Sequence, residues 1–179
     1  MKTLVIHPKD YSTDFLKPIY EGKGYDIIDF YQSPKKLKEQ MRNYDKIMMM
    51  GHGTSSGLLN VFPKVMANYI IDASFVDILK DKECVYIWCN ADNFVRKYNL
   101  KGFYTGMIIS EMNEAFFYSI KTNIFEITES NKLFASCVKT ALESEDPVKL
   151  MKESYISDKN PVIMYNSENI YSTQKITTD

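Results

Sequence analysis

The stretch KIMMMGHGTSSG, residues 46–57, decides the fold that this sequence predicts. Its segment 47–50 is apolar throughout, as in a strand that is buried on both faces of a sheet. The run ends close to His52, which stands between Gly51 and Gly53 and therefore has little steric cover. We predict a core strand over residues 46–50 that is followed by an accessible histidine. The alternative is a histidine that only hydrogen-bonds a loop carbonyl.

A second apolar run, residues 84–88, has the same shape and ends at Cys89. Further strands are predicted over residues 3–6, 25–31, 69–71, 102–109 and 161–165, and helices over 12–20, 33–43, 75–80, 90–98, 110–120, 130–144 and 146–155. Pro63 predicts a loop or hairpin within 54–72, and residues 172–179 form a polar tail. Apolar strands that alternate with helices indicate an α/β fold with a mostly parallel sheet covered on both faces.

The composition is that of one globular domain over residues 1–179, with a core over about 1–120 and C-terminal helices and a last strand over about 130–170. Hydrophobic residues make up 45% and charged residues 25% of the chain, and the formal net charge is -1. This balance gives no reason to expect nucleic acid or an anionic membrane as a partner. The first ten residues contain too few apolar side chains for a signal peptide, and no apolar run approaches the roughly 18 residues of a membrane span. We expect a soluble, cytoplasmic protein, and the oligomeric state stays open.

The three cysteines are expected to be reduced. Cys84 and Cys89 are five residues apart on one predicted strand, so their side chains point to opposite faces. With Cys137 they show no metal-ligand spacing, so we expect no metal and no cofactor. Cys84 and Cys137 are predicted to be core residues, as are the three consecutive methionines at 48–50.

His52 and Cys89 form the candidate chemical pair. Side chains beyond the carboxyl ends of parallel strands share one rim of the sheet, which is where ligands bind. The two residues are 89 − 52 = 37 positions apart, which leaves room for one crossover between neighbouring strands. An imidazole and a helix N-terminus would activate the thiol, and the Gly53 N–H could stabilise an oxyanion. Residues 55–57 are expected to form a flexible wall of the cleft.

An apolar strand ending in His-Gly, followed by YIWCNADNFVRKYNLKGFYTGMIIS, resembles the caspase-like cysteine peptidases (caspases, gingipains, clostripain, legumain, separase and CHAT domains) over residues 1–120. The resemblance implies a caspase-like three-layer sandwich, a peptide or protein substrate, and cleavage of a peptide or amide bond. It also implies a catalytic pair of His52 and Cys89, with Gly53 and Cys89 N–H groups as the oxyanion hole. Caspases have Gln-Ala before and Arg-Gly after the cysteine, whereas this chain has Ile87-Trp88 and Asn90-Ala91. This difference argues against a caspase proper and against aspartate specificity.

His7, Asp10 and Asp92 are candidates for binding the substrate; the alternatives are a structural turn for His7 and surface solvation for the carboxylates. Two other functions compete with a peptidase. One is a catalytically inert caspase-like interaction protein. The other is a flavodoxin-like module that binds phosphate or a nucleotide through GHGTSSG, although such a loop would follow the first strand. An amidotransferase-like site is a weaker alternative, because its cysteine precedes its histidine.

Overall fold

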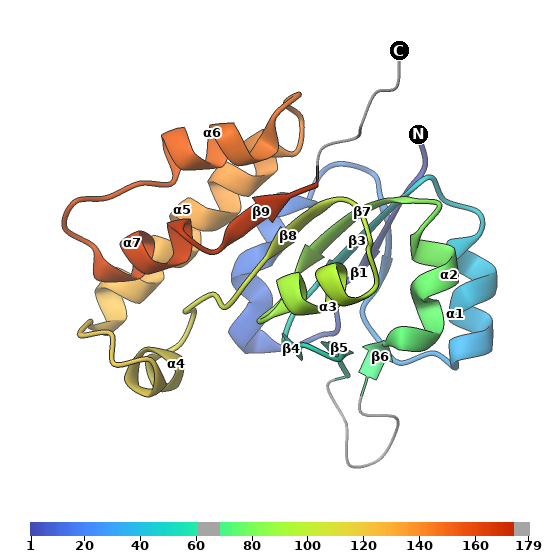
Figure 1. Ribbon diagram of the computed structural model, residues 1–179, viewed down its shortest axis with the longest axis horizontal. Helices are drawn as coiled ribbons and strands as arrows, with labels where there is room; N and C mark the ends of the chain where they lie inside the picture. The colour runs from blue at the N-terminus through green and yellow to red at the C-terminus, as the bar shows by residue number, and fades with distance from the viewer. Residues whose placement is uncertain (61–68, 174–179) are drawn as a thin grey trace.

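The central feature of the structure is a sheet of six strands (Figure 1). The computed structural model describes residues 1–60 and 69–173, so Pro63 and the tail from 174 lie outside the described residues. Across the sheet the strands are β2 (Asp26–Ile28), β1 (Thr3–Ile6), β3 (Lys46–Met50), β7 (Glu83–Ile87), β8 (Phe103–Thr105) and β9 (Ile170–Ser172). Neighbours pair in parallel, except that β9 is antiparallel to β8. The predicted α/β fold with a mostly parallel sheet is confirmed.

Helices cover both faces of this sheet (Figure 1). The first layer contains η2 (Ala73–Phe75), α1 (Pro34–Met41), α2 (Val76–Leu79) and α3 (Ala91–Lys97), and the second contains the 3₁₀ helix η1 (Tyr11–Ile19), α5 (Ile124–Ala141), α6 (Pro147–Ser154) and α7 (Pro161–Ser167). Each helix layer packs on one face of the sheet and forms a hydrophobic core with it. Successive side chains of β3 point to opposite faces, so Ile47 and Met49 lie in the first core, and Met48 and Met50 lie in the second. The methionine run is therefore core strand, as predicted. No helix within residues 1–60 or 69–173 is long and apolar enough to cross a membrane.

The C-terminal part differs from the prediction. Residues 161–165 were predicted to form the last strand, but they begin helix α7. The Asn160 side chain accepts hydrogen bonds from the N–H groups of Val162 and Ile163, and Pro161 occupies the first helical position, which needs no N–H donor. The last strand is β9, within which Ile170 is buried.

Helix α5 begins earlier than predicted, at Ile124 instead of residue 130. Asn123 accepts from the N–H of Glu126, and the Glu126 carboxylate accepts from the N–H of Asn123. This reciprocal capping box satisfies N–H groups that the first turn leaves free. The shorter helix α4 (Met112–Phe117) packs against α5 and α7 through Ala115.

A small antiparallel sheet follows β3 directly. It consists of β4 (Gly53–Thr54), β5 (Gly57–Leu59) and β6 (Tyr69–Ile71). The strand predicted at 69–71 is confirmed, and β4 and β5 are two further strands in the region where a loop or hairpin was expected. Gly57 is buried at φ +145°, and a Cβ there would lie 2.0 Å from the Ile71 carbonyl oxygen. Gly57 is therefore a close-packed strand residue and not part of a flexible wall.

Candidate functional site

His52 and Cys89 are placed by two adjacent parallel strands. Met50 of β3 pairs with Ile87 of β7, and the Gly51 N–H donates to the Ile87 carbonyl at 3.0 Å. Both side chains line one small cavity of about 20 Å³ beyond the carboxyl ends of the strands. A volume of this size holds about one water molecule.

Trp88 determines how the hairpin of β4 and β5, called the His52 hairpin because it directly follows His52, packs against β7. Its side chain is 2% exposed, and the indole Nε1–H donates to the Thr54 carbonyl at 3.0 Å. A Cβ on Gly53 would lie 2.1 Å from Cδ1 of the Trp88 ring. The bulky residue beside Cys89 is therefore core, and Gly53 has a packing reason to be glycine that is independent of any oxyanion.

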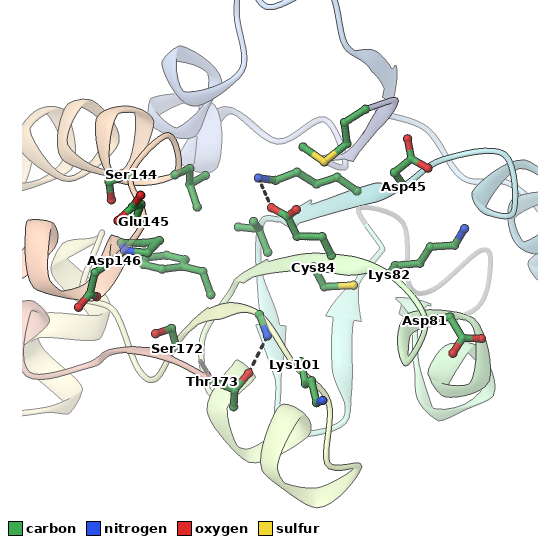
Figure 2. A pocket seen from close by; sticks show the side chains of 18 of the residues that line it. Asp45, Asp81, Lys82, Cys84, Lys101, Ser144, Glu145, Asp146, Ser172 and Thr173 are labelled. Atoms are coloured by element: carbon green, nitrogen blue, oxygen red, sulfur yellow. Dashed lines mark hydrogen bonds and ion pairs between the residues drawn. The ribbon is translucent and has the colours of Figure 1, made fainter. Parts of the chain in front are cut away.

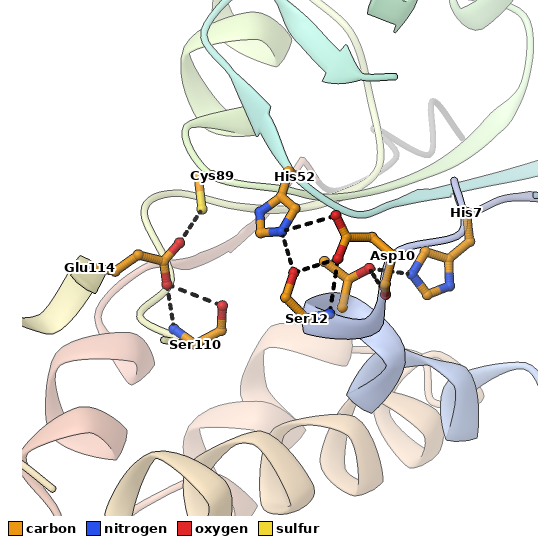
Figure 3. Close-up of polar contacts among 8 residues, drawn as sticks. His7, Asp10, Ser12, His52, Cys89, Ser110 and Glu114 are labelled. Carbon is orange, nitrogen blue, oxygen red and sulfur yellow. Dashed lines mark hydrogen bonds and ion pairs between the residues drawn. The ribbon is translucent and has the colours of Figure 1, made fainter. Parts of the chain in front are cut away.

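On one side, the His52 ring contacts two residues that follow β1 (Figure 3). Its Nε2 lies 2.6 Å from Ser12 Oγ and 3.9 Å from Asp10 Oδ2. The N–H and the hydroxyl of Ser12 both donate to Asp10 Oδ1, at 2.9 and 2.8 Å. Burial raises the pKa of Asp10, but these hydrogen bonds and the charge of His52 outweigh burial and leave the pKa below its usual value.

On the other side of the ring, the Cys89 sulfur points toward Glu114 (Figure 3). Cys89 Sγ lies 3.7 Å from Glu114 Oε1 and 3.7 Å from the Ile108 carbonyl oxygen, each within reach of the S–H group. Burial, followed by the charge of Glu114, raises the pKa of Cys89 to about 12. The thiol is therefore protonated at neutral pH, contrary to the expectation that a helix N-terminus would activate it. Within the described residues no hydrogen bond joins Cys89 to His52.

Glu114 is held by its own helix. Its Oε2 accepts from the Ser110 N–H at 2.7 Å, the Ser110 hydroxyl at 3.1 Å and the Glu111 N–H at 3.1 Å. These bonds fix the carboxylate at the start of α4, with Oε1 turned toward Cys89. Neither Glu114 nor Ser12 was among the site residues predicted from the sequence. The pattern that could have found Glu114 is the capping box of Glu111 and Glu114.

The E114Q substitution is expected to lower the pKa of Cys89, because it removes a charge that disfavours the thiolate while an amide oxygen can still accept the cap bonds. Alkylation of Cys89 by iodoacetamide at pH 8 should become about tenfold faster, as for a fall of one pKa unit. Rate–pH profiles measure the effect. The matched control is E126Q, because Glu126 closes the capping box of α5 but bonds Thr122 and Asn123 instead of a cysteine. An unchanged profile in E114Q would mean that burial alone sets the pKa.

His7 lies inside the protein, and its side chain is 3% exposed. Its Nδ1 is 2.9 Å from the Tyr20 hydroxyl and its Nε2 is 3.0 Å from Thr13 Oγ1. Burial lowers the pKa of His7 to about 4, so the ring is neutral at pH 7. Both ring nitrogens are therefore used within the chain, which leaves neither for the substrate contact that the sequence suggests.

The other two substrate-binding candidates lie in different places. Asp10 contacts the His52 ring, as described above. Asp92 lies on α3, where its Oδ2 is 3.9 Å from Arg96 Nη2 one turn later. It does not line the cavity that His52 and Cys89 share.

A larger cavity, of about 730 Å³, lies around the amino ends of β3, β7 and β8 (Figure 2). Two of its lysines have close partners: Lys46 Nζ is 2.6 Å from Glu83 Oε1, and Lys82 Nζ donates to the Tyr44 carbonyl. Cys84 also lines it, but no histidine does, whereas Cys89 shares its cavity with His52. The candidate pair of His52 and Cys89 lines the smaller cavity, at the opposite end of the strands.

The site contains one thiol, one imidazole and two carboxylates, arranged in the order Glu114, Cys89, His52 and Asp10, with Ser12 between His52 and Asp10 (Figure 3). Within residues 1–60 and 69–173, no group of three or more His, Cys, Asp or Glu side chains is placed to hold a metal ion. Nucleophilic attack and proton transfer are the chemistry that these groups can perform. Comparisons of the chain with models of protein families, with curated proteins and with solved structures find no match.

Proposed function

We propose that the protein is a cysteine hydrolase of caspase-like fold that cleaves a peptide or amide bond through Cys89 and His52. The observation that carries the proposal is the meeting of these side chains at one cavity, beyond the carboxyl ends of two adjacent parallel strands. The mostly parallel sheet with helices on both faces also supports it. The residues around Cys89 differ from those of caspases, so we do not propose cleavage after aspartate.

The reaction starts from a protonated thiol. Cys89 Sγ attacks the carbonyl carbon of the substrate while its proton passes to His52. The C–N bond then breaks, and His52 gives the proton to the leaving amine. Water deprotonated by His52 hydrolyses the thioester, which releases the acid and restores the thiol. The donors that the caspase-like resemblance implies for the oxyanion are the N–H groups of Gly53 and Cys89.

The raised pKa of Cys89 gives His52 a specific task. A thiol with a pKa of about 12 is almost entirely protonated at pH 7, so attack requires a base at the moment of reaction. His52 lines the same cavity as Cys89 and is the base that we assign to this step. Substrate binding must also widen the cavity, because about 20 Å³ does not hold a peptide carbonyl.

The H52A substitution is expected to slow labelling of Cys89 by a peptide-derived thiol electrophile by about 100-fold at pH 7, the usual loss when a general base is removed. Mass spectrometry of the adduct measures the rate and locates the modified residue. The H52A protein should keep its circular dichroism, because this ring is partly exposed. Equal labelling of the two proteins would remove His52 from the mechanism.

A second candidate, a catalytically inert protein of the same fold, is favoured by the Cys89–Glu114 contact. This contact holds the thiol proton away from His52, and the cavity of about 20 Å³ that both side chains line is too small for a peptide carbonyl. In an inert protein, Cys89 reacts with a peptide electrophile no faster than a simple buried thiol does. The labelling experiment therefore separates the two candidates.

A further inference from the structure

The two nitrogens of the His52 ring have different surroundings. Nε2 faces Ser12 and Asp10, whereas the other side of the ring faces Cys89 (Figure 3). Among the described residues, none forms a hydrogen bond with Nδ1. The ring therefore stands between a polar pair and the thiol, and the position of its proton decides which nitrogen can act as a base.

The hydrogen bonds of Ser12 determine which nitrogen of the His52 ring carries the proton. An ionised aspartate can only accept, so the hydroxyl proton of Ser12 goes to Asp10 Oδ1, at 2.8 Å. The Ser12 oxygen then presents lone pairs to His52 Nε2, at 2.6 Å. A bond between these two atoms forms only if Nε2 carries the proton. The free lone pair of the neutral ring is then on Nδ1, the nitrogen on the side of Cys89.

We propose that Asp10 and Ser12 are positioning residues that hold His52 in the Nε2–H tautomer, so that Nδ1 accepts the proton of Cys89. The part of this inference that concerns proton transfer rests on the proposed function of the Cys89–His52 pair. After proton transfer both ring nitrogens are donors, and the Asp10 carboxylate, 3.9 Å from Nε2, then faces a positive imidazolium. Asp10 and Ser12 therefore also favour the charged ring that the reaction produces.

The local backbone keeps this pair in place. Asp10 has an extended backbone and is the N-cap of η1; its side chain accepts from the Ser12 N–H, and its carbonyl accepts from the Thr13 N–H at 3.1 Å. Thr13 in turn contacts the buried His7. The end of β1 and the start of η1 are thereby tied together, and Ser12 reaches His52 from a fixed position. A supporting shell of this kind is what precise placement of a base requires.

The experiment compares D10N, S12A and S12T with the wild type by two readouts. Long-range ¹⁵N NMR of the imidazole rings reports the tautomer without any need for turnover, and the chain has two histidines to assign. Labelling of Cys89 by the peptide electrophile reports the proton transfer. Asparagine is as good an N-cap as aspartate, so D10N should fold.

The expected result is that wild-type His52 is predominantly Nε2–H. In D10N the amide oxygen keeps the bonds that Oδ1 accepts from Ser12, and the NH₂ group takes the place of Oδ2, 3.9 Å from Nε2. A donor then faces Nε2, so the Nδ1–H fraction should rise. Labelling of Cys89 should fall by at least about tenfold in D10N and S12A, and S12T should restore it because threonine keeps the hydroxyl. The control D14N removes a carboxylate of the same helix that pairs with Lys17 and should change neither readout.

Three outcomes would overturn the inference. The first is a His52 tautomer that is the same in the wild type, D10N and S12A. The second is a changed tautomer with undiminished labelling of Cys89 that still depends on His52. The third is an S12T protein that behaves like S12A. By contrast, labelling that does not depend on His52 in the wild type would refute the proposed function, while the NMR readout would still decide whether Asp10 and Ser12 set the tautomer.

Discussion

The C89A substitution is expected to abolish covalent labelling of the protein by a peptide-derived thiol electrophile. If a cleavable peptide amide is found, its hydrolysis should fall on the order of 10⁶-fold, as when other hydrolases lose their nucleophile. No other thiol can take over, because Cys84 is 1% and Cys137 is 7% exposed. Intact-mass spectrometry after a timed incubation measures the labelled fraction.

The matched control for C89A is C137A, which removes a buried sulfur of helix α5 that belongs to the second core and does not line the cavity of Cys89. This variant should be labelled at the wild-type rate if it folds, and thermal unfolding checks that both variants do. An adduct on Cys84 or Cys137, or equal labelling of C89A and the wild type, would contradict the assignment of Cys89 as the nucleophile.

The G53A substitution is expected to destabilise the protein by about 3 kcal/mol, the upper end of the usual cost of overpacking. The new Cβ would come within 2.1 Å of the Trp88 ring and within 2.8 Å of the Gly57 carbonyl oxygen, so the hairpin or the indole has to move. Movement of the hairpin also displaces His52 and weakens the bond from Trp88 to Thr54. For a chain of this length the melting temperature should fall by roughly 10 °C.

Two further variants show whether the Trp88 ring causes this loss. S56A changes an exposed residue of the same hairpin and should leave the melting temperature within about 1 °C, as surface substitutions usually do. In the double variant G53A/W88L the smaller side chain leaves space for the new methyl group. The cost of G53A should therefore be smaller in W88L than in the wild type. Equal costs in both backgrounds would mean that Gly53 is needed for a reason other than Trp88.

The layers of the fold could be predicted because they depend on local patterns. Residues 47–50 and 84–88 are apolar on both faces, and this pattern occurs where helices cover a sheet on both sides. Residues 161–165 were assigned wrongly because PVIMY suits a strand or a short buried helix. Asn160 favours the helix, and its side chain also donates to the Glu126 carbonyl, a contact across 34 residues that a local pattern does not contain.

The candidate site also combines a part that the sequence predicts with contacts between distant segments that it does not. His52 and Cys89 lie at one cavity because strand ends gather on one edge of a parallel sheet, which is a rule of topology. Their partners depend on side-chain contacts between distant segments: Ser12 reaches His52 across 40 residues, and Glu114 reaches Cys89 across 25. Glycine at position 53 suggested an oxyanion donor, whereas the packing reason for a glycine there, an added Cβ only 2.1 Å from the Trp88 ring, depends on a contact between distant segments. Contacts of this kind cannot be predicted from local sequence patterns, because they form only when the helices and strands pack together.

Trp88 is the single tryptophan of the sequence. Its indole is buried next to Cys89, packs edge-on to Phe94 with ring centroids 5.7 Å apart, and holds the His52 hairpin through Thr54. The tryptophan fluorescence of the protein therefore comes from the strand end that carries the thiol. Water entering when the hairpin lifts away, or a group attached to the sulfur, changes the surroundings of this one fluorophore. The molecule thus carries an optical reporter of its own site that needs no dye and no substrate.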